Sequence, residues 1–159
     1  MSFWDTLLDL MGTVKNKESK IGSLGEIAFE VSNYDRILTL DNYTKGISAN
    51  YVEHEVIGSK PLLEFTGAKL QTISFDIRIS SYLGYNPRSQ MAKLIEYCEQ
   101  GAVLTFILGD APIGENKWII ESISEKAEQF LGNGEILSCV ASVSLKEYIE
   151  DEVKADENN

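Results

Sequence analysis

Cysteine, histidine and proline are scarce in this chain of 159 residues, which has two cysteines, one histidine and three prolines. The two cysteines, Cys98 and Cys139, are far apart in sequence, which excludes a disulfide-rich scaffold and suits buried, reduced thiols in a reducing cytosol. Together with a single histidine they cannot supply a conventional zinc site. The longest apolar runs have fewer than about ten residues, so no segment is long enough to span a membrane.

Positive charge is also scarce, with 14 lysines and arginines against 25 acidic residues and a formal net charge of -11. A protein that binds nucleic acid needs a basic patch that releases counterions from the phosphates, and the sequence has no basic cluster interleaved with aromatics. We therefore expect neither direct sequence-specific binding of nucleic acid nor adsorption to an anionic membrane. We interpret residues 149–159 as an acidic, flexible tail, with a contact for a partner or a repulsive channel lining as the alternative.

The N-terminal residues carry an apolar pattern at helical spacing. Ser2 followed by Asp5 resembles a capping box, and the apolar side chains that follow are Phe3, Leu7, Leu10 and Val14. This predicts a short amphipathic helix over residues 3–12, which docks either on its own domain or on a neighbouring chain. The segment has no cationic start and is interrupted by acids, so we do not expect a secretory signal. Residues 13–23 are polar and aperiodic and predict a linker.

From Gly25 onward the pattern changes to the alternation that is typical of strands. About seven strands are predicted, at 27–31, 49–57, 62–65, 70–79, 103–108, 118–130 and 135–148, with a short candidate strand at 37–40. Gly132-Asn133-Gly134 between the last two strands is a strong hairpin signal. In the closing strand we expect alternate residues to face inward: Leu137, Cys139, Ala141, Val143 and Leu145. Ser138, Ser142 and Ser144 are expected to face outward.

One internal helix is predicted between Pro87 and Gly101. Asn86 is a good N-cap, proline fits the first helical position, and glycine fits just past the end. Four apolar residues form one stripe along this helix: Met91, Leu94, Ile95 and Cys98. The stripe indicates a helix that lies on a sheet. The economical arrangement is an α+β fold with mostly antiparallel strands, built as a sandwich or a barrel-like sheet with one packed helix.

The sequence holds few candidates for chemistry. His54, between Val52 and Val56 on a strand, is interpreted as structural; as a catalytic base it has no serine or cysteine nucleophile that can be paired with it. Glu53 and Glu55 lie on one strand face, roughly 7 Å apart by strand rise. That spacing could suit hydrolysis by paired carboxylates, but we interpret it as a solvated face. We therefore expect no enzyme and no catalytic, cofactor-binding or metal-binding residues.

Two further patterns in the sequence bear on the binding of ligands. The glycines of the segment 109–114 lack the Lys-Ser/Thr ending of a phosphate-binding loop and are interpreted as turn residues. The aromatics Tyr82, Tyr85 and Trp118 could line the mouth of a pocket in a sandwich module that binds a small ligand or a peptide. We interpret these three side chains as core or interface residues, and keep the binding module as the alternative of another class.

The order of elements from Pro61 onward carries a resemblance. The segment 61–67 (PLLEFTG) has a proline, an apolar run and an F-x-G motif, and the strand that begins LQTISF follows at residues 70–75. Five further features follow in order: a helix ending at a glycine, an apolar strand at 104–109, Gly114 shortly before Trp118, the hairpin and a closing strand. Over roughly residues 24–148 this order resembles the GpU family of phage tail proteins. The chain departs from the family pattern at residues 1–23, in the acidic tail and at residues 110–112.

The resemblance implies a structural subunit of a contractile phage tail, or of a related contractile injection particle such as a tailocin. Family members are similar to tail-tube proteins, which build stacked hexameric rings from a β-sandwich or barrel with a flanking helix. We expect a ring at the baseplate end that joins the hub to the tail tube. A tail terminator or completion ring at the head end is the alternative.

The same resemblance implies partners and a location. The partners are other copies of the chain, the tail tube protein, the baseplate hub and sheath-initiating proteins. The protein would be assembled in the host bacterial cytoplasm and reside in the virion tail or injection particle. In a closed ring the long strands 70–79, 118–130 and 135–148 would offer edges to neighbours, and an acidic lumen would repel DNA. The expected organisation is a helix and linker at 1–23, a tail-tube-like β domain at 24–148 and the tail at 149–159.

Overall fold

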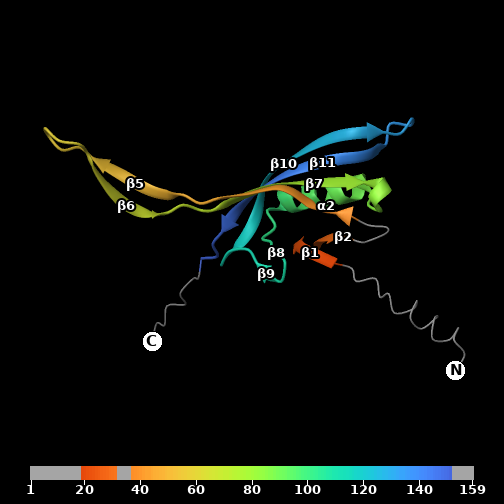
Figure 1. Ribbon diagram of the computed structural model, residues 1–159, viewed down its shortest axis with the longest axis horizontal. Helices are drawn as coiled ribbons and strands as arrows, with labels where there is room; N and C mark the ends of the chain where they lie inside the picture. The colour runs from red at the N-terminus through yellow and green to blue at the C-terminus, as the bar shows by residue number, and fades with distance from the viewer. Residues whose placement is uncertain (1–18, 32–36, 152–159) are drawn as a thin grey trace, which may run out of the picture.

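The structure is a computed structural model that describes residues 19–31 and 37–151. The helix expected over residues 3–12 and most of the acidic tail lie outside the described residues. Figure 1 shows a body of sheets and one helix, from which a long two-stranded hairpin projects. The pairing of strands is antiparallel throughout the described part of the chain.

The described residues form eleven strands, one α-helix and one short 3-10 helix. In chain order these are β1 (Ser19–Leu24), β2 (Ile27–Val31), β3 (Ile37–Leu38), β4 (Leu40–Gly46), β5 (Ala49–His54), β6 (Leu62–Ala68), β7 (Thr72–Ser80), η1 (Ser81–Leu83), α2 (Pro87–Gln100), β8 (Phe106–Leu108), β9 (Ala111–Pro112), β10 (Lys117–Phe130) and β11 (Ile136–Tyr148). Most strands lie where alternation predicted them, and β3 lies within the candidate strand at 37–40. β1, β4 and β9 account for the larger number, because none of them was predicted as a strand.

β1 overturns part of the linker that was expected over residues 13–23. From Ser19 onward the chain is a strand, which pairs with β2 on one side and with β8 on the other. Gly22 lies so close to β8 that an added Cβ would collide with the Ile107 carbonyl oxygen. Glycine is the residue that allows two backbones to approach in this way. Because it has no side chain, it also interrupts the alternation by which a strand is found in sequence.

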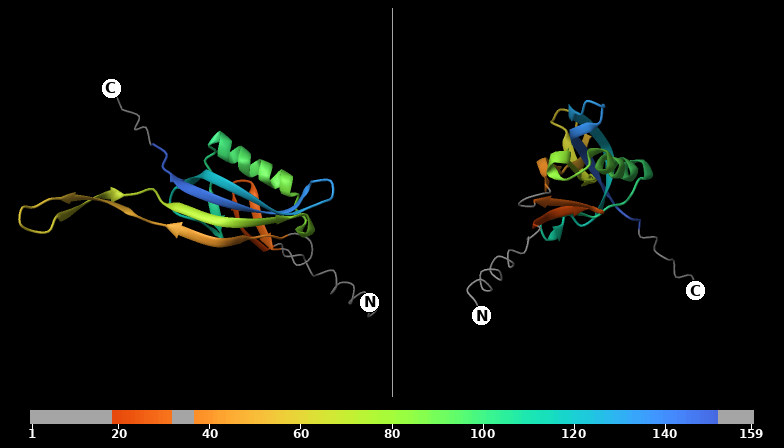
Figure 2. Two further views of the ribbon diagram at one scale, coloured as in Figure 1. Left: turned by 90° about the horizontal axis from the view of Figure 1, so that it is seen from above. Right: turned by 90° about the vertical axis from the view of Figure 1, so that its right-hand side faces the viewer.

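The core lies between two sheets and the helix. The five-stranded sheet has the order β3-β2-β1-β8-β9, and the four-stranded sheet has the order β10-β11-β7-β4. Three phenylalanine rings meet in the core, from Phe29 of β2, Phe75 of β7 and Phe106 of β8. The ring centroids are 6.2 Å apart for Phe29 and Phe75, 5.3 Å for Phe75 and Phe106, and 6.4 Å for Phe29 and Phe106. Such edge-on and stacked ring pairs join the two sheets across the core. Figure 2 shows α2 running along the four-stranded sheet, where it contacts β10 and β11.

The two long central strands bury one face, as their alternation predicts. The buried side chains are Ile73, Phe75, Ile77 and Ile79 on β7, and Cys139, Ala141, Val143 and Leu145 on β11. Ser142 is exposed and Ser144 half-buried, as expected for the outward face. Ser138 departs from the prediction, because it is buried although its neighbours in sequence alternate around it.

Helix α2 has the ends that the sequence predicts. The Asn86 side-chain oxygen accepts hydrogen bonds from the backbone N–H groups of Arg88 and Ser89, at 3.0 and 3.4 Å. Gly101 ends the helix in the left-handed region, with φ 62°. Met91 and Leu94 of the predicted stripe are buried, whereas Ile95 is 40% exposed. Among the described residues, no helix is both long and apolar enough to cross a membrane.

The fold is α+β with mostly antiparallel strands, as expected, but the described part of the chain does not close a barrel. The four-stranded sheet is open, and its outer strands are β10 and β4. Of the three long strands expected to offer edges, β7 and β11 are interior strands paired on both sides. Only β10 of those three is an outer strand of this sheet, and its outer edge is bridged to Leu104 at Trp118 and joins no further strand of the sheet beyond that point; β4 supplies the other edge.

The projecting hairpin consists of β5, β6 and the turn between them, and we call it the arm (residues 49–68). β4 leads into β5, and β6 leads into β7, so the arm extends the strands of the four-stranded sheet away from the body (Figures 1 and 2). The strand predicted at 49–57 ends at His54. The arm forms a two-stranded sheet of its own. Its sides are therefore left uncovered over most of its length.

Candidate functional site

One face of the arm carries an apolar patch. Tyr51 lies opposite Phe65 in the hairpin register, and their rings meet edge-on with centroids 5.5 Å apart. Leu63 lies on the same face, opposite Glu53. Tyr51, Leu63 and Phe65 are 56%, 60% and 59% exposed. At the turn Ile57 is fully exposed.

The other face of the arm is mixed. Val52 and Leu62 are exposed apolar residues on this face. Beside them His54 Nε2 lies 2.6 Å from Glu64 Oε2. Both side chains are more than half exposed, so solvent screens this pair and it contributes little to stability. The sequence indicated a structural role for His54, and the structure places this side chain on the projecting arm, where it is more than half exposed.

This much apolar surface on an isolated hairpin points to an interface. A two-stranded hairpin is marginally stable in water unless something packs against it. Contiguous exposed apolar patches on soluble proteins mark interaction sites, and covering one side chain the size of Leu or Phe gains about 1.5–3 kcal/mol. The patch formed by Tyr51, Leu63 and Phe65 is therefore the strongest candidate for a functional surface.

Glu147 anchors the base of the arm. Its Oε1 accepts a hydrogen bond from the Asn116 side-chain amide at 2.7 Å, and its Oε2 accepts one from the Gln71 backbone N–H at 2.9 Å. These two donors hold the pKa of the Glu147 carboxyl below its ordinary value. The Gln71 side-chain oxygen, by contrast, is buried with no hydrogen-bond partner within the described residues.

The uncovered face of the four-stranded sheet is rich in serine. Three serines lie side by side across β7, β11 and β10, namely Ser74, Ser144 and Ser122. In the next row Asp76 accepts hydrogen bonds from the Ser142 hydroxyl at 2.6 Å and from the Asn42 amide at 2.7 Å. Both bonds lower the pKa of Asp76. The face is thus polar, built mainly of small side chains.

Charges on this side of the sheet are paired across strands. Arg78 lies 2.8 Å from Glu128, and Lys146 lies 3.6 Å from Glu121. Each of these pairs is partly exposed and contributes little to stability. These pairs leave the four-stranded sheet without a large excess of positive or negative charge, although the whole chain has a formal net charge of -11.

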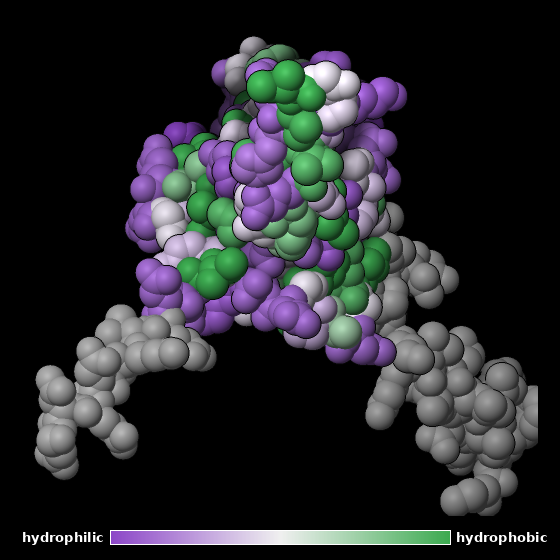
Figure 3. Space-filling model, turned by 90° about the vertical axis from the view of Figure 1, so that its left-hand side faces the viewer, coloured by the Kyte–Doolittle hydropathy of each residue, from purple (hydrophilic) through white to green (hydrophobic). Residues whose placement is uncertain are grey.

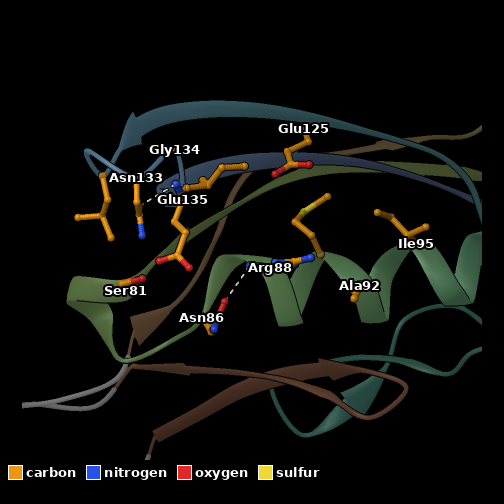
Figure 4. Close-up of a pocket in the computed structure, with 12 residues that line it drawn as sticks. Ser81, Asn86, Arg88, Ala92, Ile95, Glu125, Asn133, Gly134 and Glu135 are labelled. Atoms are coloured by element: carbon orange, nitrogen blue, oxygen red, sulfur yellow. Dashed lines mark hydrogen bonds between the residues drawn. The ribbon is translucent and has the colours of Figure 1, made fainter.

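A groove lies between α2 and the hairpin that joins β10 to β11 (Figure 4). Its volume is about 580 Å³. The apolar lining residues are Met91, Ala92, Ile95, Leu131 and Ile136. Arg88, Glu125 and Glu135 supply charge at its walls. The groove exists because the hairpin continues past the sheet and stands over the first turns of the helix.

The carboxylates and aromatics considered from sequence do not form a site together. Glu53 and Glu55 are exposed on the arm, away from the groove. Tyr82 is exposed on the surface, and the Tyr85 hydroxyl donates to a Glu30 carboxylate oxygen at 3.2 Å. Trp118 is buried in the core, where its Nε1–H donates to the Ile113 carbonyl oxygen at 2.8 Å.

The cysteine thiols and acidic side chains are the groups that could bind a metal ion. Within residues 19–31 and 37–151, no group of three or more His, Cys, Asp or Glu side chains could hold a metal ion. Cys98 and Cys139 are free thiols. Burial, together with the nearby carboxylates Glu125 and Glu128, raises the pKa of Cys139 to about 11. A thiol of that pKa is protonated at neutral pH and is a weak nucleophile.

Sequence reasoning missed the arm as a functional surface, although a signal was present. Residues 49–65 place apolar side chains on both faces of the predicted strands, among them Tyr51 on one face and Val52 on the other, whereas a strand on the outside of a body alternates. The anchor at Glu147 gave no signal, because its partners lie 31 and 76 positions away in sequence.

Comparison with known families decides what these surfaces belong to. The model of the family described as Phage P2 GpU matches residues 25–150. The chain belongs to the Phage P2 GpU family. This confirms the resemblance based on the order of elements, and the match begins just after β1. A comparison with curated proteins found no match.

Membership of the GpU family makes this chain a phage tail-associated structural protein. A structural protein of a tail acts through its surfaces, by contacts with other tail proteins. The exposed apolar arm and the two unpaired sheet edges of this GpU-family member are surfaces of that kind.

Proposed function

We propose that this GpU-family protein is a ring-forming subunit of a contractile tail or contractile injection particle, with no catalytic activity. The ring, a hexamer by resemblance to tail-tube proteins, stands at the baseplate end and joins the hub to the tail tube. The observation that carries the proposal is the arm, whose exposed Tyr51, Leu63 and Phe65 need a partner surface. In a monomer this apolar patch would stay exposed to water, because it lies away from the core, and such patches mark interaction sites.

The free edges of the four-stranded sheet supply the sideways contact. β10 and β4 are on opposite sides of this sheet. Pairing of β4 from one copy with β10 of the next would continue the sheet from subunit to subunit and remove both edges. Such a contact joins two different surfaces, so it closes into a ring when the rotation between copies allows it. The rings would enclose a lumen.

In this arrangement the serine-rich face is the one available to line the lumen. The opposite face of the four-stranded sheet is covered by the core. A lining of small polar groups such as Ser74, Ser144 and Ser122 offers neither an apolar patch nor a strong field to a passing polymer. Acidic repulsion of DNA would then come from elsewhere on the ring, since the charges Arg78 and Glu128 are paired here.

The partners follow from the position. The tail tube protein, the baseplate hub and sheath-initiating proteins would surround the ring, and assembly would take place in the host bacterial cytoplasm. The alternative position is a terminator or completion ring at the head end of the tube. Antibody against this protein, applied to intact particles and viewed by electron microscopy, distinguishes the two: label at the baseplate end supports the first, and label at the head end replaces it with the second.

The oligomeric state is the first test. Sedimentation velocity and negative-stain microscopy of the purified chain, alone and with the tube and hub proteins, should show closed rings of six copies. The Tyr51→Ser, Phe65→Ser double variant should be folded, by circular dichroism, yet assemble less. A chain that stays monomeric with every neighbouring tail protein would end the proposal.

The groove gives the second function class, a small-ligand or peptide-binding module, one observation in its favour. Its volume of about 580 Å³ is in the range of ligand pockets. A thermal-shift screen of the full chain would reveal a ligand as a raised Tm. A shift that disappears in the Ile95→Asp variant, from a protein that does not form rings, would favour this class.

A further inference from the structure

We propose that the tip of the arm of one copy seats in the groove between α2 and the β10–β11 hairpin of the next copy. This inference rests on the self-assembly stated above and names the two surfaces that meet. Ile57 is the leading side chain, and Ile95 and Leu131 receive it.

The tip of the arm presents exposed apolar side chains. Ile57 is fully exposed at the turn, and the adjoining Val56, Leu62 and Leu63 are also exposed. Figure 3 looks at the molecule from the end that carries the arm, and apolar surface runs along the projecting part. Each of these four side chains is at least 40% exposed.

The groove offers apolar side chains that could contact the apolar tip of the arm. Ile95 and Leu131 are 40% and 44% exposed, and with Met91, Ala92 and Ile136 they form the apolar part of a lining that also carries polar and charged side chains. A volume of about 580 Å³ accepts several side chains of the size of isoleucine. Figure 4 shows Ile95 and Ala92 along the helix and Asn133 and Gly134 on the hairpin above.

The charges of the two surfaces can be matched. Arg88 at the groove has no ion-pair partner among the described residues. The tip of the arm carries Glu55, which could pair with it. Glu125 and Glu135 are the acids of the groove, and Lys60 in the turn of the arm offers them a cation. These are exposed groups, so we expect them to orient the contact rather than to supply most of its free energy.

The positions of the two surfaces exclude a contact within one copy. The arm extends from one end of the molecule, and the β10–β11 hairpin with the groove lies at the other end (Figures 1 and 2). The arm of a chain therefore cannot reach the groove of the same chain. The contact must join two different surfaces on two copies, which makes it heterologous.

Another occupant of the groove is available for comparison. Residues 1–18 precede β1, and their sequence predicts an apolar helix face. Helices commonly bind in apolar grooves. We favour the arm because its apolar tip is exposed in the structure and the matching charges are in place. The experiment below separates the two occupants.

Photo-crosslinking of the full chain tests the contact. Benzoylphenylalanine is placed at position 57 in one sample and at position 95 in another, and labelled and unlabelled copies are mixed so that mass spectrometry identifies links between copies. We expect links from position 57 to residues 88–95 and 131–136 of another copy. The matched control carries the same group in place of Ile149, which is exposed on the body. Links from position 57 to other surfaces only, or links from position 95 to residues 1–18, would overturn the proposal.

Two variants measure the contact in assembly. Ile57→Asp and Ile95→Asp should each raise the concentration needed for assembly by about tenfold to a hundredfold, and the double variant should be little worse than either. Ile149→Asp is the control and should assemble like the parent chain. If the parent chain never assembles, both the proposed function and this inference fail. If the parent chain and both variants form the same rings equally well, only this inference fails.

Discussion

Glu147 and Gln71 hold each other by two hydrogen bonds at the base of the arm. The Gln71 backbone N–H donates to Glu147 Oε2 at 2.9 Å, and the Glu147 backbone N–H donates to the Gln71 carbonyl oxygen at 2.9 Å. Gln71 directly precedes β7, where the returning strand of the arm enters the body. The pair therefore fixes the direction in which the arm leaves the four-stranded sheet.

Removal of this carboxylate should loosen the arm. We expect Glu147→Ala to lower the free energy of unfolding by about 1 kcal/mol, the value of an ordinary hydrogen bond, and to speed hydrogen exchange at the Gln71 amide. Glu150→Ala is the control, because Glu150 pairs with Lys117 at 2.9 Å in an exposed position, and its loss should change stability by less than about 0.5 kcal/mol. Equal effects from both variants would contradict the anchoring role.

Acid should destabilise the folded protein through two carboxylates of the four-stranded sheet, Asp76 and Glu147. Hydrogen bonds hold the pKa values of Asp76 and Glu147 below their ordinary values of 3.8 and 4.5. Across this range the folded state binds fewer protons than the unfolded state. The stabilisation is therefore complete above the ordinary values and is lost as the pH falls through the lower pKa values of the folded state.

We expect the free energy of unfolding, measured in urea at a series of pH values, to decrease as the pH falls from about 5 to 3. The Asp76→Asn, Glu147→Gln double variant should show a shallower decrease, because its amides do not titrate. A decrease of the same steepness in the variant would mean that other carboxylates are responsible.

Two phenylalanines provide a matched test of core against interface. Phe75 is buried between Phe29 and Phe106, so Phe75→Ala should lower the free energy of unfolding by about 3–5 kcal/mol. Phe65 is 59% exposed on the arm, so Phe65→Ala should change the stability of the monomer by less than about 1 kcal/mol while weakening assembly. A Phe65 variant that assembles normally would remove this residue from the interface.

Gly22 tests whether β1 belongs to the folded body. A Cβ at this position would collide with the Ile107 carbonyl oxygen, so Gly22→Ala must push β1 away from β8. We expect a loss of stability of at least about 1–3 kcal/mol and faster hydrogen exchange in β1 and β8. Gly132→Ala is the control, because nothing lies within 4 Å of an added Cβ there and no positive φ is involved.

Deletion of residues 1–14 tests the role of the predicted N-terminal helix. The described residues bury a core of their own between the two sheets and α2, so we expect the truncated chain to fold and its assembly to weaken. Circular dichroism and sedimentation velocity measure the two effects separately. Loss of folding would instead assign the helix to its own domain.

Local patterns predicted the elements that local chemistry controls. Asn86, Pro87 and Gly101 predicted the ends of α2 to the residue, because caps and left-handed glycines act within a few positions. Alternation predicted the buried faces of β7 and β11 for a similar reason. Alternation missed β1, because Gly22 removes a side chain from the pattern. Helical spacing placed Ile95 inward, but the surface of α2 is only partly covered at this residue.

The amino-acid sequence alone determined the class of fold and the family. Each of these depends on residue types and on their spacing along the chain. Only the tertiary structure decided that β4 and β10 are the free edges, that residues 49–68 project as an arm, and that α2 and the β10–β11 hairpin enclose a groove. Edges and grooves arise from pairing between strands that are distant in sequence, and no local pattern records which strand is left without a neighbour.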